Sequence, residues 1–172
     1  MSLRPPVSEL DHTYGKTSAP IELVEYGDYQ CPHCGAAYPI IKKIQRELDG
    51  QLRFVFRNFP LRNVHPQALE AAVATEAAAM QGKFWGMHDL LFENQSALNH
   101  VSIIRYARGL DLNVTKFNVD VTLPELESKV LSDFQNGLRS GVNATPTFFV
   151  NGLKFEGDWR SGELREFLTS LL

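Results

Sequence analysis

Two cysteines, Cys31 and Cys34, are the only thiols in the chain, and two residues separate them in the segment EYGDYQCPHCGAAYP. Cysteines at this spacing bind a metal ion, close a structural disulfide, or carry electrons by thiol-disulfide exchange. A structural zinc site usually needs four protein ligands, and the sequence has neither a second Cys-x-x-Cys nor a suitably spaced pair of histidines. A disulfide across so short a loop constrains the unfolded chain little. We therefore favour electron transfer and expect no metal and no cofactor, with the other two uses kept as alternatives.

The segments beside the cysteines predict a strand, a helix and a second strand. PIELVEYGDY, residues 20–29, is rich in β-branched and aromatic residues and indicates a buried strand. After the cysteines, Tyr38, Ile41, Ile44 and Leu48 recur at the spacing of a helix, with Pro32 suited to its first turn. QLRFVFRNFPL, residues 51–61, alternates in the manner of a strand. This β-α-β order predicts two parallel strands with the cysteines at the start of the helix between them.

A helix N-terminus suits a reactive cysteine. The first turn of a helix has unpaired backbone N–H groups and the positive end of the helix dipole, and both favour a thiolate over a thiol. The thiolate is the species that attacks a disulfide. Stabilising it also stabilises the reduced form, which makes the corresponding disulfide a stronger oxidant.

The rest of the chain predicts a helical block followed by a hairpin. Residues 64–141 favour several helices, and Thr122 followed by Glu125 resembles a capping box. Asn151-Gly152 lies between two apolar runs and predicts a type I′ hairpin turn, and SGELREFLTSLL predicts a final helix. Without a polar linker or a repeat, the sequence favours an α/β fold with one domain, residues 1–172, in which 64–141 is an insertion.

Composition excludes several classes of function. The chain has 172 residues, of which 44% are apolar, and its formal net charge of -3 with no cluster of like charge argues against a nucleic-acid partner. The first residues lack the charged start and apolar run of a secretory signal, and no apolar stretch is long enough to insert directly into a membrane. We expect a cytoplasmic location for the chain as printed, and a periplasmic one if an export signal has been removed.

The combination of a strand, Cys-Pro-His-Cys at a helix start, a helical insertion and a distant Thr-Pro resembles the thioredoxin-like superfamily. Within it, the chain is similar to the DsbA-like thiol-disulfide oxidoreductases over about residues 10–172. The resemblance implies a thioredoxin-like fold with a helical insertion. Members of this group without an export signal include domains similar to those attached to membrane antiporters, which leaves a reductive or detoxifying role open.

The resemblance implies a role for each residue of the motif. Cys31 resembles the exposed nucleophile of the family and Cys34 its buried resolving thiol, while Pro32 and His33 tune the pair. Elementary electrostatics agrees for His33, because an imidazolium beside Cys31 would stabilise the thiolate. A surface histidine without a catalytic role is the alternative.

Three further residues match positions that the family uses. The family keeps an acidic residue at the position of Glu25 as a proton acceptor, and a buried carboxyl there would have a raised pKa. The alternative is a glutamate that reaches solvent at a strand end. Pro146 matches the cis-proline loop that faces the cysteines, and Thr145 would present its backbone to a peptide substrate. The alternative is a trans proline at an ordinary strand start.

These expectations define a thiol-disulfide oxidoreductase that exchanges a Cys31–Cys34 disulfide with protein dithiols through a mixed disulfide at Cys31. Its partners would be protein or peptide thiols and a redox partner that the sequence does not identify. The alternative from another class is a non-enzymatic redox-sensing or peptide-binding module that uses the same cysteine pair.

Overall fold

Five strands form one mixed sheet in the computed structural model, which describes residues 1–172. They are β1 (His12–Tyr14), β2 (Ile21–Gly27), β3 (Leu52–Asn58), β4 (Thr147–Val150) and β5 (Leu153–Lys154). Across the sheet they follow the order β1-β3-β2-β4-β5. The central strands β2 and β3 are parallel, as the sequence predicts, and the other neighbours are antiparallel. The strand that leads to the cysteines is therefore the middle one of the sheet.

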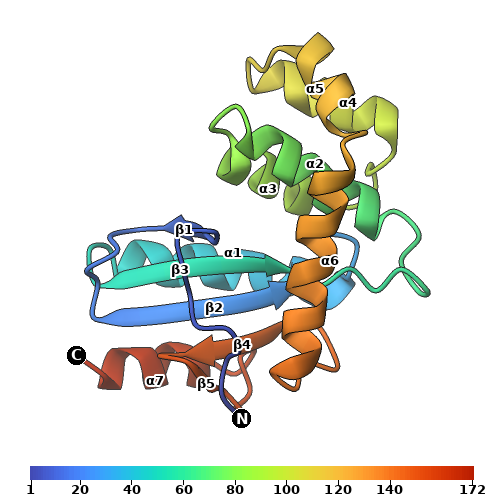
Figure 1. Cartoon of the computed structure of the whole chain (residues 1–172). Coiled ribbons are helices and arrows are strands. Elements are labelled where there is room, and N and C mark those ends of the chain that lie inside the picture. The colour runs from blue at the N-terminus through green and yellow to red at the C-terminus, as the bar shows by residue number, and fades with distance from the viewer.

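The chain also forms seven helices, which pack against the sheet or beyond one end of its strands. They are α1 (Pro32–Glu47), α2 (Ala68–Ala79), α3 (Phe84–Glu93), α4 (His100–Gly109), α5 (Val114–Asp120), α6 (Pro124–Arg139) and α7 (Glu163–Ser170). In Figure 1, α1 lies behind the sheet, α6 crosses in front of it, and α2 to α5 form a separate layer beyond one end of the strands. None of the seven has the length and apolar composition needed to cross a membrane.

The main core joins the sheet to the helical block. A cluster of 30 buried residues includes Leu23 of β2, Ile44 of α1 and Leu168 of α7, and it continues without a break into Met87 of α3 and Phe117 of α5. Burial of such side chains provides most of the favourable free energy of folding. The helical block thus shares its apolar interior with the strand and helix that hold the cysteines.

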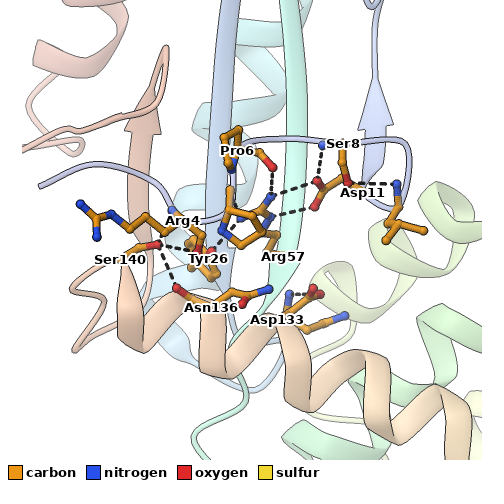
Figure 2. A network of polar contacts seen from close by, with 12 residues as sticks. Arg4, Pro6, Ser8, Asp11, Tyr26, Arg57, Asp133, Asn136 and Ser140 are labelled. Atoms are coloured by element: carbon orange, nitrogen blue, oxygen red, sulfur yellow. Dashed lines mark hydrogen bonds and ion pairs between the residues drawn. The ribbon is translucent and has the colours of Figure 1, made fainter.

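The opposite face of the sheet is held by a buried arginine. The guanidinium of Arg57, on β3, donates two hydrogen bonds to Asp11, at 2.7 and 2.9 Å, and one to the hydroxyl of Tyr26 at 3.0 Å. It also donates to the backbone carbonyls of Pro5 and Pro6. Figure 2 shows this network between the N-terminal segment, the sheet and α6. A buried guanidinium is stable only when its donors are paired, so this network fixes the N-terminal segment across the sheet.

Most local predictions are confirmed, and two features differ from the sequence analysis. The Asn151-Gly152 turn has positive φ at both residues, 47° and 78°, as a type I′ turn requires. The predicted capping box is wrong: α6 begins at Pro124, and the Thr122 hydroxyl donates to the carbonyl of Val119 instead. Proline at the first helical position needs no hydrogen-bond partner for its nitrogen, so the helix starts there without a side-chain cap. The short strand β1 was not predicted.

One prediction concerns the assignment of 64–141 as an insertion within a single domain. The two tryptophans lie in different parts, Trp85 in α3 and Trp159 just before α7. Trp85→Phe therefore leaves a fluorophore in the α/β part, and Trp159→Phe leaves one in the helical block. Because the core is shared, we expect each variant to unfold in urea with coincident fluorescence and far-ultraviolet circular dichroism transitions. A fluorescence midpoint that departs from the circular dichroism midpoint in either variant would indicate two independent domains.

Candidate active site

The cysteine pair lies where β2 ends and α1 begins. Cys31 is the N-cap residue of α1, with an extended backbone (φ -69°, ψ 123°), and Pro32 occupies the first helical position. Cys34 follows on the first turn, and both residues are free thiols. Because β2 is the central strand, the first turn of α1 lies beyond the carboxyl end of the middle strand of the sheet. The predicted position of the pair at the start of a helix is confirmed.

The two thiols are less different in exposure than the family resemblance implies. Cys34 is fully buried, and Cys31 is only 3% exposed. Cys31 is covered in part because the Thr145-Pro146 loop lies against it: its thiol donates to the carbonyl of Thr145 at 3.6 Å. The prediction of an exposed Cys31 therefore needs correction, since its sulfur lies beneath this loop.

The surroundings shift the pKa values of the two thiols in opposite directions. The pKa of Cys31 falls from its usual 9.0 to about 5, chiefly because the thiol of Cys34 donates to its sulfur, and the backbone N–H groups of Cys34 and His33 add to this effect. Burial opposes the shift without cancelling it. The pKa of Cys34 is well above 9.0, because burial disfavours its thiolate and its proton is donated to Cys31. At neutral pH the pair is therefore a thiolate at Cys31 beside a thiol at Cys34.

Glu25 is buried in β2, 3% exposed, and its Oε1 atom has no hydrogen-bond partner. Burial raises the pKa of this carboxyl from 4.5 to about 8, with a smaller contribution from the charge of Cys31. The alternative of a glutamate that reaches solvent is excluded. When Glu25 is ionised, its negative charge also raises the pKa of Cys34.

A small cavity separates Glu25 from the surface. It has a volume of about 30 Å³, and half of its lining residues are hydrophobic. The polar lining residues are Glu25, Gln45, His88 and the partly exposed ion pair of Lys42 and Asp89. A cavity of this size has room for one or two water molecules, and the polar groups on its walls can bind them. Glu25 thus faces a cavity that also reaches the Lys42–Asp89 pair, although its side chain is buried.

His88 was not singled out by the sequence analysis. Its ring is buried, and its Nδ1 atom lies 2.9 Å from the hydroxyl of Tyr29. Burial lowers the pKa of His88 to about 3, so the ring is neutral, and it shares a hydrogen bond with the Tyr29 hydroxyl. A neutral histidine beside Glu25 and the cavity adds a polar group there without adding a charge.

The loop that faces the sulfurs contains Thr145 and Pro146, whose peptide bond is cis as the sequence predicts. Thr145 is 6% exposed, and its hydroxyl is buried without a partner. A free hydroxyl beside a sulfur can donate to it once the thiol ionises, because a thiolate is a better acceptor. The structure thus brings together residues that lie far apart in the sequence.

His33 contacts the side chain of Arg160. Nη2 of Arg160 lies 2.7 Å from Nδ1 of His33 at the surface, and its guanidinium lies over the ring of Trp159 at 4.1 Å. A guanidinium has donors and no acceptor, so Arg160 donates to Nδ1 of His33. Arg160, which the sequence analysis missed, thus places a positive charge beside His33, and the predicted tuning role of His33 stays a prediction.

Asp28 orders the loop between β2 and α1. Its buried carboxylate accepts from the backbone N–H of Gln30 at 2.8 Å and of Leu61 at 2.9 Å, and it pairs with Nδ1 of His65 at 2.8 Å. The Asp28 N–H points at the sulfur of Cys34 at 3.5 Å. No group of three or more His, Cys, Asp and Glu side chains is arranged to hold a metal ion. The backbone and carboxylate of Asp28 thus form hydrogen bonds with the Cys34 sulfur and with the loop that precedes the cysteines.

Comparison with known proteins agrees with this geometry. The family model described as Thioredoxin matches residues 8–170. The chain belongs to this family. Among solved structures, BdbD from Bacillus subtilis superposes with a TM-score of 0.84 at 25% identity, over 96% of this chain and 95% of that one. α-DsbA1 from Wolbachia pipientis superposes with a TM-score of 0.81 at 22% identity, over 96% and 92%. The thioredoxin-like α/β fold and the resemblance to DsbA-like proteins are thus confirmed.

A second kind of relative belongs to much longer proteins. The Na⁺/H⁺ antiporter NhaA 1 of Mycolicibacterium vanbaalenii is 40% identical over 94% of this chain, but the chain spans only 27% of that protein. The similarity therefore concerns a thioredoxin-like part of the antiporter. Together with the DsbA-like structures, the family supports a general thiol-disulfide oxidoreductase.

The opposite pKa shifts predict which thiol reacts first. We expect iodoacetamide to modify Cys31 of the reduced protein before Cys34 at about pH 6, because only Cys31 has a pKa below this value. Mass spectrometry identifies the site, and the rate against pH should have a midpoint near 5. The denatured protein is the control, since both cysteines then ionise near about 8.5. Faster modification of Cys34 in the folded protein would reverse the two roles.

Proposed function

We propose that this chain is a thiol-disulfide oxidoreductase that exchanges a Cys31–Cys34 disulfide with the dithiols of protein substrates. The observation that carries the proposal is the unequal ionisation of the pair, with a pKa of about 5 for Cys31 and one well above 9.0 for Cys34. A thiol of low pKa is both a ready nucleophile and a good leaving group. Neither a structural disulfide nor a metal site needs such asymmetry.

In the oxidising direction, a substrate thiolate attacks the sulfur of Cys31 in the disulfide. A substrate–Cys31 bond forms, the Cys31–Cys34 bond breaks, and Cys34 leaves as a thiolate that takes a proton. A second substrate thiolate then attacks the substrate sulfur of this mixed disulfide, and Cys31 leaves as its stabilised thiolate. The substrate gains one disulfide and the enzyme becomes a dithiol, so two electrons pass to the enzyme.

In the reverse direction the protein thiol Cys34 must lose its proton before it can resolve a mixed disulfide. We assign this proton transfer to Glu25, whose pKa of about 8 lies near neutral pH. A group with such a pKa both accepts and donates protons readily. The cavity between Glu25 and the Lys42–Asp89 pair supports the assignment, because water bound to its polar groups could return the proton to solvent.

We assign substrate binding to the backbone of Thr145, beside Pro146. The carbonyl oxygen of Thr145 lies 3.6 Å from the Cys31 sulfur, so a peptide linked to Cys31 would lie along this segment. Main-chain hydrogen bonds hold an extended peptide irrespective of its side chains, which suits an enzyme with many substrates. Pro32 and His33 contribute to the surface around the sulfur, with Arg160 as the charged neighbour of His33.

The direction of net electron flow follows from the compartment. A pair whose dithiol form is stabilised oxidises substrate thiols where the surroundings keep it as the disulfide, and it reduces substrate disulfides where reduced glutathione keeps it as the dithiol. Both locations therefore fit the proposal, the cytoplasm with a reductive role and the periplasm with an oxidative one. The transport activity in the name of the antiporter relatives belongs to far longer proteins, and the proposal does not extend it to this chain.

Turnover distinguishes this proposal from a redox-sensing module. We expect the protein to catalyse many cycles of disulfide exchange, measured as insulin reduction with excess dithiothreitol or as oxidation of a dithiol peptide with excess glutathione disulfide. A sensor would react once per molecule and stop. A reaction that ends after one equivalent in both assays would therefore favour the module.

Single-cysteine variants test the direction of attack. Cys34→Ser, incubated with a peptide that contains an internal disulfide, should accumulate a peptide adduct at Cys31, because the thiolate can attack but nothing resolves the product. Non-reducing electrophoresis and mass spectrometry detect the adduct. Cys31→Ser is the matched variant and should form little of it. Equal trapping by both variants would contradict a single nucleophile.

Glu25→Gln tests the proton transfer. We expect resolution of the mixed disulfide to slow by about 10- to 100-fold at neutral pH, because the proton acceptor for Cys34 is lost without loss of volume. The wild-type rate should rise with pH around the pKa of about 8, and the variant should lose this dependence. Identical rates and pH profiles would leave Glu25 with a structural role only.

The same variant should change stability in a pH-dependent way. A carboxyl whose pKa is raised from 4.5 to about 8 stabilises the fold fully below pH 4.5, and this contribution is lost as pH rises through 8. At about 1.4 kcal/mol per pKa unit, the loss amounts to several kcal/mol. The oxidised Glu25→Gln protein should therefore gain stability relative to wild type between these pH values. A constant difference in unfolding free energy would contradict a buried, ionising Glu25.

A further inference from the structure

Gln95, in the loop after α3, holds the peptide that carries the nucleophilic cysteine. Its Nε2 atom lies 2.9 Å from the carbonyl oxygen of Tyr29 and 2.9 Å from that of Cys31. Both partners are acceptors, so only the two donors of a side-chain amide nitrogen satisfy them. One side chain of the helical block thus binds the loop on both sides of Gln30.

The first turn of α1 leaves room for this amide only because residue 35 is glycine. A Cβ atom at Gly35 would lie 2.0 Å from Oε1 of Gln95 and 2.6 Å from its Cδ. Distances this short are not possible between side chains, so any larger residue would displace the amide. Close packing against Gln95 therefore explains why the residue that directly follows Cys34 is glycine.

The carbonyl that Gln95 binds is also the first acceptor of the helix. The N–H of Gly35 donates to the Cys31 carbonyl at 3.0 Å, and Gln95 donates to the same oxygen. An N-cap residue commonly fixes its own orientation with a side-chain hydrogen bond to its helix, but Cys31 makes no such capping bond, and its thiol donates to the Thr145 carbonyl instead. Its backbone orientation, and with it the position of the sulfur near the N–H groups of the first turn, depends on contacts from elsewhere.

We propose that Gln95 is a positioning residue for disulfide exchange, which keeps the Cys31 peptide oriented so that the sulfur lies against the first-turn N–H groups and the Thr145 loop. The inference rests on the exchange reaction proposed above and assigns the helical block a part in it. Gln95 does not touch the reacting sulfurs. It acts through the backbone of Cys31, so its loss should weaken the stabilisation of the thiolate rather than remove a reacting group.

Gln95→Met tests the proposal, because methionine has similar length and no donor. Gln95→Met removes both hydrogen bonds, and we expect the equilibrium with glutathione to shift about threefold to tenfold towards the disulfide, because the reduced form loses part of its thiolate stabilisation. The pH midpoint of Cys31 thiolate absorbance at 240 nm should move upward. Gln81→Met is the matched control. Gln81 is another glutamine of the helical block that binds backbone, at Asn113, and its replacement should change neither reading.

Gly35→Ala provides an independent route to the same effect. The added methyl group should displace the Gln95 amide and shift the glutathione equilibrium in the same direction as Gln95→Met. In a Gln95→Ala background the space is vacant, so Gly35→Ala should then have little further effect. A fully additive double variant would mean that the two residues do not act through one contact.

The possible outcomes separate this inference from the proposed function. A wild-type protein that does not exchange with glutathione would refute the exchange reaction itself. Normal wild-type exchange with an unchanged equilibrium constant in Gln95→Met would refute only the role of Gln95. Equal losses of melting temperature in the oxidised and reduced variant, without a shift in equilibrium or thiolate midpoint, would make Gln95 a purely structural residue.

Discussion

The position of Cys31 at the N-cap of α1 is the constraint on which the rest of the site depends. At this position a sulfur lies beside backbone N–H groups that the helix itself leaves unpaired. The central strand β2 fixes where the helix begins, and Pro32 makes the first helical residue one that needs no hydrogen-bond partner. A displacement of this turn would alter the ionisation of both cysteines together.

Burial acts to raise the pKa of Glu25, Cys31 and Cys34, and hydrogen bonds reverse the shift only at Cys31. Desolvation raises the pKa of Glu25 and Cys34, while the Cys34 thiol and the first-turn N–H groups lower that of Cys31 in spite of its own burial. The three groups titrate as an interacting set, so a change at one alters the others. This coupling is the physical reason why a neutral donor, a thiolate and a protonated carboxyl can coexist at one buried place near neutral pH.

Features encoded locally were predictable from the sequence. Cys31 and Cys34, the strand before them, the helix after them and the Asn151-Gly152 turn each follow from residues that are neighbours in the chain. The Thr122 cap was wrong because a capping motif competes with the proline that follows it, and Pro124 determined the start of the helix.

Other contributions were not predictable, because they arise from contacts between distant segments. Arg160 reaches His33 across 127 residues, and Gln95 reaches Cys31 across 64. Thr145 and Pro146 were found only through the family resemblance. A lone glutamine or arginine in a loop has no pattern that distinguishes it from a solvated side chain. Gly35 provides a weak signal, since glycine inside a helix is unfavourable unless close packing requires it.

The stability of the reduced protein relative to the oxidised protein, measured by thermal unfolding between about pH 4 and 9, tests the fold's stabilisation of the Cys31 thiolate most directly. Because the pKa of Cys31 is lowered from 9.0 to about 5, its contribution is present at high pH and lost as pH falls through 5. We expect the reduced form to be the more stable at neutral pH and its advantage to shrink steadily towards pH 5. An advantage that is absent at neutral pH, or independent of pH, would contradict a thiolate stabilised by the fold.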